Sequence, residues 1–152
     1  MDRFIVHEGD LYNNQIYLLN GHALADCSKM GGTFFDKTGK CYVLSSDKAD
    51  WNQGRLNCQK QKNGDLASMP DEETMNFIKN NVGIEFSTST WFGGKKESGG
   101  NWQWVDGSNW FYTHWDSVEG DPDVVGDAFI YIFKGNWRDA SGSTPLPYIC
   151  QY

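Results

Sequence analysis

Acidic side chains gather in a stretch of the sequence that shows no clear helix or strand pattern. This stretch runs from Asn109 to Asp127, and its second half carries four carboxylates, Glu119, Asp121, Asp123 and Asp127. A long ordered loop in a compact domain is usually functional. Carboxylate oxygens suit a hard cation such as calcium, although an acidic loop can equally serve solubility. We predict that the working surface lies around Asp121-Pro122-Asp123.

The residue types that usually carry catalysis do not form a recognisable set. His7 and His22 lie near the N-terminus, and His114 stands between Thr113 and Trp115, without an obvious nucleophile. No Ser or Cys lies in a nucleophile elbow. A glycosidase would need two carboxylates at a defined separation and in distinct environments. The sequence therefore predicts a binding protein and not an enzyme.

Four cysteines, Cys27, Cys41, Cys58 and Cys150, allow three disulfide pairings. No pair has zinc-finger spacing, so structural disulfides and an extracellular, secreted location are the favoured interpretation. Residues 36–39 read as a turn between two short strands, and Cys27 could face Cys41 across such a hairpin. That would leave Cys58 to pair with Cys150.

The length and the net charge of the chain indicate the number of domains and exclude some classes of binding partner. The 152 residues fit one domain. The formal net charge of -7 argues against nucleic acid and anionic membrane surfaces, which attract basic stripes. No apolar run approaches the length of a transmembrane helix, so membrane insertion is not expected either.

Periodicity and capping signals predict two helices followed by strands. The first helix is expected over 48–61, capped by Ser46 or Asp47, and the second over 70–81, capped by Ser68. Apolar segments around 90–94, 102–105, 129–133 and 146–150 predict antiparallel strands separated by turns. This order of elements indicates the α+β class.

Residues 1–26 differ from the rest of the chain, because short apolar groups there are broken by Gly9-Asp10 and Asn13-Asn14. We interpret them as an N-terminal extension of one or two extended segments, which could add an edge strand or mediate self-association as a homodimer.

The ordered set of motifs over about residues 27–152 resembles the C-type lectin-like domain family, in its long form with an N-terminal hairpin disulfide. The set comprises Cys41-Tyr42, Trp51 with Cys58, Asp65-Leu66-Ala67-Ser68, Trp91-Phe92-Gly93-Gly94, Trp102 to Ser108, Trp115, the acidic triplet around Pro122, Trp137-Arg138-Asp139 and Tyr148-Ile149-Cys150. The resemblance implies two helices flanking antiparallel sheets, with a long irregular loop that carries calcium and sugar. It also supports the Cys58–Cys150 pairing.

Sugar-binding members of that family hold calcium with side chains on both sides of a proline, a nearby acidic residue and an Asn-Asp pair after a Trp. The resemblance implies the ligands Asp121, Asp123, Asp127 and Asp139, with a cis peptide before Pro122. A glycan or glycoprotein would then bind at Asp121, Asp123, Arg138 and Asp139, with Glu119 as a spare carboxylate and Trp110 as a stacking surface. Lys95 and Lys96 stand where an auxiliary site would need acids, so at most one calcium ion is expected.

The sequence departs from the family pattern in three places. Arg138 replaces the expected Asn, and a guanidinium cannot ligate a metal. The triplet Asp-Pro-Asp offers acceptors only, whereas family members combine one carboxylate with one amide. The disulfide that usually braces the loop is missing, because its positions fall near Ala128 and Gly142. Packing by Trp110, Trp115 and Trp137 is expected to replace it, unless a bound ion does.

These departures leave alternatives open. Arg138 could supply the missing hydrogen-bond donor to a sugar, which keeps a calcium-dependent lectin. Alternatively, it could pair with Asp121 or Asp123 as a built-in cation, which makes a calcium-independent module for a protein ligand. A role in binding ice or mineral is a third hypothesis, since such members also occur in the family.

Overall fold

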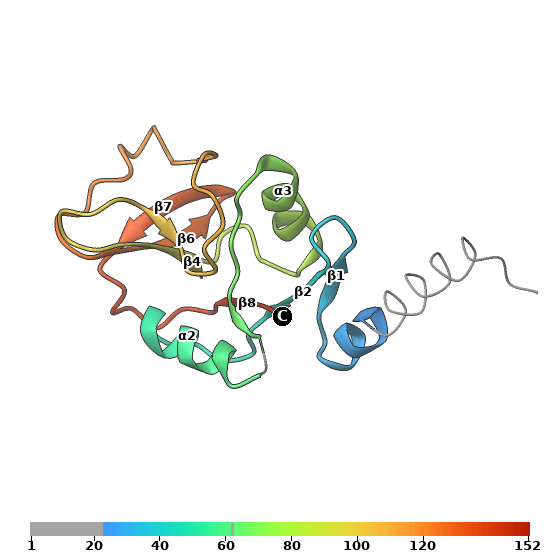
Figure 1. Ribbon diagram of the computed structural model, residues 1–152. Coiled ribbons are helices and arrows are strands. Elements are labelled where there is room, and N and C mark those ends of the chain that lie inside the picture. The colour runs from blue at the N-terminus through green and yellow to red at the C-terminus, as the bar shows by residue number, and fades with distance from the viewer. Residues whose placement is uncertain (1–22, 62) are drawn as a thin grey trace, which may run out of the picture.

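The computed structural model describes residues 23–61 and 63–152, and the other residues fall outside the description. Two four-stranded sheets form the body of the molecule (Figure 1). The lower sheet has the order β1-β2-β8-β3, and the upper sheet has the order β5-β4-β6-β7. All strand pairs in both sheets are antiparallel. The α+β class and the predicted fold are therefore confirmed.

The strands of the lower sheet are β1 (Thr33–Phe35), β2 (Lys40–Leu44), β3 (Asp65–Leu66) and β8 (Ile149–Gln151). Those of the upper sheet are β4 (Thr90–Lys96), β5 (Gln103–Trp104), β6 (Ala128–Phe133) and β7 (Asn136–Ala140). β4 extends through Lys96, two residues beyond the predicted strand segment 90–94. Helix α2 covers Trp51–Gln59 and helix α3 covers Glu72–Asn81.

Both helices start later than predicted, because aspartates cap them. The Asp50 carboxylate accepts the Gln53 amide at 2.8 Å, which sets the start of α2. The Asp71 carboxylate accepts the Thr74 amide at 2.7 Å and sets the start of α3. The caps predicted from sequence were wrong, and Ser68 is instead buried in a polar network described below.

The N-terminal prediction was partly wrong. Residues 23–29 are helical, not extended, and this helix carries Cys27. Cys27 therefore reaches Cys41 on β2 from a helix and not from a strand of the β1–β2 hairpin. The rest of the predicted extension, 1–22, lies outside the described residues, and the boundary between 26 and 27 stays a prediction.

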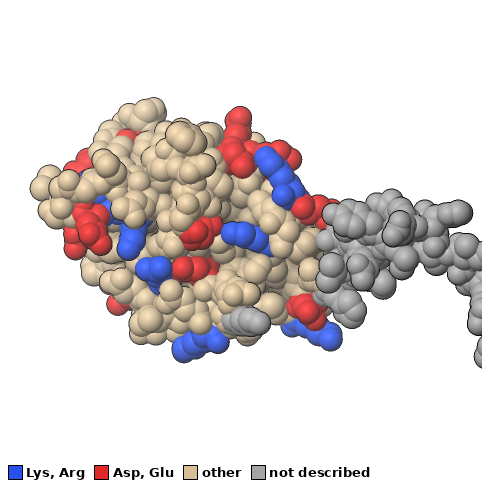
Figure 2. Space-filling model, viewed as in Figure 1, with Lys and Arg blue, Asp and Glu red and all other residues tan. Residues whose placement is uncertain are grey.

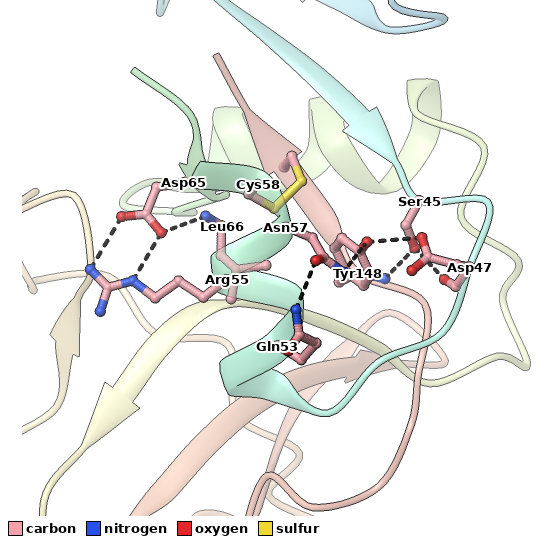
Figure 3. Close-up of a disulfide and its surroundings, with 10 residues drawn as sticks. Ser45, Asp47, Gln53, Arg55, Asn57, Cys58, Asp65, Leu66 and Tyr148 are labelled. Carbon is pink, nitrogen blue, oxygen red and sulfur yellow. Dashed lines mark hydrogen bonds and ion pairs between the residues drawn. A yellow bond between two sulfur atoms is a disulfide. The ribbon is translucent and has the colours of Figure 1, made fainter. Parts of the chain in front are cut away.

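Both predicted disulfides are confirmed, since Cys27 bonds to Cys41 and Cys58 to Cys150. The second one ties α2 to the last strand, β8, beside a cluster of polar contacts (Figure 3). There the Tyr148 hydroxyl donates to Asp47 at 2.8 Å and accepts from the Asn57 amide at 3.1 Å. The chain end is thereby fixed to the first helix of the domain.

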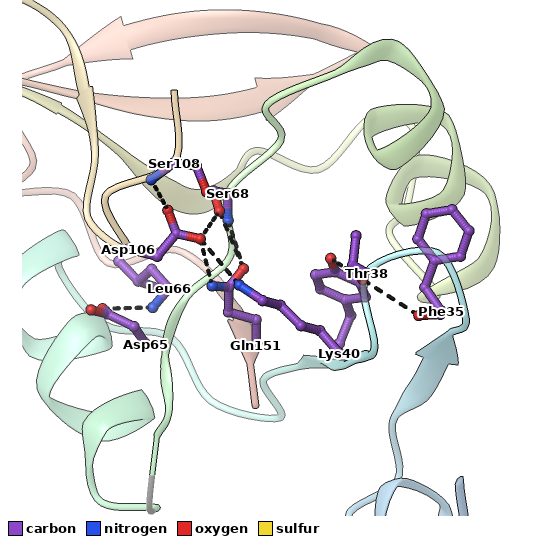
Figure 4. A network of polar contacts seen from close by, with 10 residues as sticks. Phe35, Thr38, Lys40, Asp65, Leu66, Ser68, Asp106, Ser108 and Gln151 are labelled. Atoms are coloured by element: carbon purple, nitrogen blue, oxygen red, sulfur yellow. Dashed lines mark hydrogen bonds and ion pairs between the residues drawn. The ribbon is translucent and has the colours of Figure 1, made fainter. Parts of the chain in front are cut away.

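A second polar network joins the two sheets around Asp106, which follows β5 (Figure 4). One carboxylate oxygen accepts from the Ser68 hydroxyl, from the Gln151 amide at 3.0 Å and from the Lys40 ammonium at 3.2 Å. The other accepts the Ser108 amide at 2.9 Å. Burial alone would raise the pKa of Asp106, but these donors outweigh it and hold the pKa well below its usual range.

The core is built largely from aromatic rings. Trp51, Trp91, Trp137 and Phe92 are at most 1% exposed. Met75 and Ile78 are buried on the inner face of α3.

Packing takes the place of the missing loop disulfide. The Phe129 ring lies 4.3 Å from the Trp51 ring, centroid to centroid. A Cβ atom at Gly142 would come within 2.5 Å of Phe129 Cδ2, so only a glycine fits there without a shift. Since Gly142 also has a φ of 88°, the backbone favours glycine as well.

Candidate functional site

The long loop from Asn109 to Asp127 rises above the upper sheet, at the upper left of Figure 1. It contains only turns and one isolated bridge, between Trp115 and Trp137 of β7. At this bridge the Trp137 amide donates to the His114 carbonyl, and the Asp116 amide donates to the Trp137 carbonyl, both at 2.8 Å. The bridge fixes the middle of the loop to the edge of the sheet.

A cluster of tryptophan rings supports this loop from below. Trp110 lies 4.7 Å from Trp104 and 5.9 Å from Trp137, and Trp115 lies 4.9 Å from Trp102, between ring centroids. The expected support by tryptophan packing is therefore present. Trp110 packs among the other rings, whereas its neighbour Phe111 is 88% exposed.

Three of the predicted carboxylates come together at the end of the loop. Asp121, Asp123 and Asp139 each place one oxygen within 4.8 Å of the others. The peptide bond before Pro122 is cis, as the resemblance implied. Asp139 comes from β7, so one side of the group stands on a sheet strand and the other on the loop.

Asp139 also organises the backbone of the acidic triplet. Its two carboxylate oxygens accept the amides of Asp123 and Val124, at 3.1 and 3.0 Å. The side chain is almost fully buried. Charge-assisted bonds to a carboxylate are among the stronger hydrogen bonds in proteins, so Asp139 fixes the backbone of the triplet at Asp123.

Arg138, the neighbour of Asp139 on β7, contacts the same group. Its Nε donates to Asp121 Oδ2 at 3.0 Å, and its Nη2 lies 3.8 Å from Glu119 Oε2. The Asp121 side chain is 3% exposed. Burial raises the pKa of this carboxyl, Arg138 lowers it, and the nearby Asp139 raises it further, so the net pKa shift is upward. One guanidinium therefore compensates only part of the negative charge of four carboxylates.

Asp127 does not join this group. Its carboxylate accepts the backbone amide of Ser98 at 2.8 Å, in the turn after β4. Nearby, the Lys96 ammonium donates to the Val124 carbonyl at 3.2 Å and lies 5.3 Å from the centroid of the Trp102 ring. These contacts tie the end of the loop to β4. The sequence indicated that Lys96 replaces an acidic residue but did not reveal its bond to Val124.

Comparison with known proteins identifies the family to which most of this domain belongs. The Lectin C-type domain profile matches residues 47–152. The chain belongs to the C-type lectin domain family. Members of this family are carbohydrate-binding domains and not enzymes.

Relatives with this domain differ in size. The chain is 29% identical over 127 residues to the C-type lectin lectoxin-Lio3 of Erythrolamprus poecilogyrus, covering 78% of each chain. It is 31% identical over 127 residues to the CD209 antigen of Symphalangus syndactylus, where the match covers 78% of this chain and 31% of that protein. The domain therefore occurs both as most of a protein and as one part of a longer one.

Solved structures include both carbohydrate-binding and calcium-independent proteins. A mouse scavenger receptor C-type lectin carbohydrate-recognition domain is 31% identical with a TM-score of 0.63, covering 79% of this chain and 91% of that chain. A calcium-independent type II antifreeze protein is 25% identical with a TM-score of 0.68, covering 80% and 91%. Among the helices of the described residues, none has the length and apolar character needed to cross a membrane.

Proposed function

We propose that this domain recognises a glycan, or the glycan of a glycoprotein, with the help of one calcium ion at Asp121, Asp123 and Asp139. The observation that carries the proposal is the convergence of these three carboxylates within 4.8 Å. Calcium takes six to eight oxygen ligands, with carboxylates, carbonyls and water among them. The donor set therefore fits calcium, with ligand positions left for other oxygens.

A bound calcium would offer such positions to sugar hydroxyls. The chain's own residues have separate roles. Asp139 holds the amides of Asp123 and Val124, while Asp121 and Asp123 would accept hydrogen bonds from the sugar hydroxyls. Arg138 is the donor at this site, because the Asp-Pro-Asp triplet supplies acceptors only.

Phe111 offers an exposed aromatic ring, on the same loop, for the apolar face of a sugar. The structure buries much of Trp110 among other rings but leaves Phe111 exposed, and aromatic rings stack on apolar faces. Two disulfides and the family relation support an extracellular, secreted protein.

Calcium binding is tested by isothermal titration calorimetry and by thermal melting with calcium or chelator. A ligand that binds only the folded state raises the melting temperature. We expect a rise with calcium that Asp139→Asn abolishes. Asp127→Asn is the matched control, because Asp127 bonds to Ser98 outside the group, and its calcium affinity should equal that of the wild type. No rise in millimolar calcium would contradict the proposal.

Glycan recognition needs its own measurement. On a glycan array, the labelled protein should bind in calcium and lose binding in chelator, and Phe111→Ala should weaken binding without changing the melting temperature. Glycan binding that persists in chelator would contradict the role of calcium, and the absence of any glycan binding would favour the second candidate.

That second candidate is a calcium-independent binding module, and the 3.0 Å contact between Arg138 and Asp121 favours it. The guanidinium would act as a built-in cation for the loop. The acidic triplet would then be a structural element, with the exposed Phe111, Val118 and Val125 as the contact surface for a protein ligand.

A further inference from the structure

A hollow of about 340 Å³ lies between the end of α3, the segment that follows it and the β6–β7 turn. Its volume is in the range of small-ligand sites. Asp139 lies four residues along β7 from Gly135 of the turn, a separation on the order of 13 Å. The hollow is therefore distinct from the carboxylate group.

Apolar side chains form much of the lining, namely Ile84, Phe86, Ile132 and Phe133. The rim is open, since Phe86 is 67% exposed. An exposed aromatic ring beside a concave apolar surface is a suitable place for the ring or chain of a small organic molecule.

Two lysines, Lys79 and Lys134, belong to the lining of the hollow. The Lys79 Nζ is 3.9 Å from the point where a Cβ on Gly135 would stand, and Lys134 directly precedes Gly135 in the turn. Lys134 Nζ lies 5.3 Å from the Phe133 ring centroid. Within the described part of the chain, neither ammonium forms an ion pair.

The third charged residue of the lining is Glu85, and its carboxylate is held by a hydrogen bond to a neighbouring side chain. Its Oε2 accepts from the Thr88 hydroxyl at 3.1 Å. The Thr88 amide donates to the Glu85 carbonyl, and the Lys134 amide donates to the Phe86 carbonyl at 2.8 Å. These backbone bonds fix the wall between residues 85 and 88 to the β6–β7 turn, so the hollow is preformed.

The backbone at Lys134 is a further sign of a role for its side chain. Lys134 has a φ of 50° and Gly135 a φ of 78°, as in a two-residue turn that favours Asn-Gly. A lysine at the first of these positions is disfavoured relative to Asn. An unfavourable residue in a turn is a reason to ask what its side chain does.

We propose that this hollow binds a small amphipathic organic anion. Its apolar ring or chain lies on Phe86, Ile84 and Phe133, and its carboxylate or sulfonate pairs with the ammonium groups of Lys79 and Lys134. Charge complementarity carries the assignment, because two lysines without an ion pair among the described residues border an apolar surface in a protein of net charge -7.

Heteronuclear NMR titration of the full chain tests the proposal with 2-naphthoate and with neutral 2-naphthalenemethanol. Amide shifts should centre on Lys79, Phe86, Lys134 and Gly135. The anion should bind about ten times more tightly than the alcohol, because two charge-assisted contacts are added.

Lys134→Asn is the decisive variant, since it removes the ammonium and suits the positive φ. Its naphthoate affinity should fall about five-fold, while its alcohol affinity is unchanged and its melting temperature is equal or higher. Lys48→Asn, at an exposed position, loses the same charge and should bind naphthoate as the wild type does. Should Lys134→Asn fail to fold, Lys134→Gly gives the same test.

Three results would overturn the proposal: equal affinity for the two probes, unchanged naphthoate affinity in Lys134→Asn, or shifts centred outside the hollow. Because neither probe nor variant touches the carboxylate group, a failure here leaves the proposed glycan site unaffected.

Discussion

Replacing Arg138 by Asn should tighten calcium binding. Arg138 Nε lies 3.0 Å from Asp121 Oδ2, and calcium binds carboxylate oxygen at about 2.4 Å. A dication on Asp121 would therefore stand about 5 Å from the guanidinium. At the dielectric constant of water, charges of +2 and +1 at that distance repel by about 1.7 kcal/mol. Removing the repulsion should lower the Kd for calcium by about ten- to twenty-fold.

The dielectric constant of water gives the smallest repulsion, because the Arg138 side chain is 28% exposed and the Asp121 side chain only 3%, so the expected gain in calcium affinity is a lower bound. Asn also adds a side-chain carbonyl, which is a suitable calcium ligand. Calorimetric titration of the wild type and the variant measures the change directly.

The matched control is Arg138→Lys, which keeps the charge and should show no gain in calcium affinity. In chelator, Arg138→Asn should melt about 2–4 °C lower, because Asp121 is buried and loses a donor worth about 1 kcal/mol. An Arg138→Asn variant that binds calcium as weakly as the wild type, or more weakly, would refute the idea that the two cations compete.

Three further outcomes follow from the packing and the pKa shifts. Asp106→Asn should lower the melting temperature at pH 7 by about 5–10 °C, since several donors surround a carboxylate that is 12% exposed. The pKa of Asp106 is depressed in the folded state, so its stabilisation is present above the unfolded-state pKa of about 3.9 and is lost as the pH falls below it. Melting between pH 2 and 7 should therefore show a steeper acid loss in the wild type than in Asp106→Asn; parallel curves would contradict this. Gly142→Ala should cost about 2 kcal/mol more than Gly107→Ala in chemical denaturation, because both glycines have positive φ but only Gly142 faces a ring.

Local signals in the sequence were sufficient for the existence of α2, α3 and most strands, whereas the Cys58–Cys150 pairing also drew on the resemblance. The apolar period of α3, the turn at 36–39 and the apolar segment 129–133 of β6 all report on contacts between near neighbours in the chain. The cap predicted at Ser68 was wrong because this side chain has partners far away in the sequence. Ser68 bonds to Asp106 and Gln151, residues 38 and 83 positions away, and no local rule reveals such partners.

The residues of the candidate site also fall into those that the sequence predicted correctly and one that it did not. Asp121 and Asp123 share one proline and were predictable as a pair, and the resemblance added Asp139. Asp127 follows Asp123 closely in sequence, but its carboxylate turns to the Ser98 amide. Sequence proximity in an irregular loop does not fix the direction of a side chain. Which carboxylates come together therefore depends on the folded backbone of the loop.

The β6–β7 hairpin connects the two proposed sites, with Lys134 at its turn and Arg138 and Asp139 along β7. Charges about 13 Å apart are largely screened at physiological ionic strength, where the Debye length is about 8 Å. The hairpin is also held in continuous register from Phe129–Ala140 to Phe133–Asn136, so it offers no second arrangement through which one site could alter the other. Binding of an anion in the hollow should therefore leave the calcium affinity of the carboxylate group unchanged. Each site would bind its own ligand independently of the other.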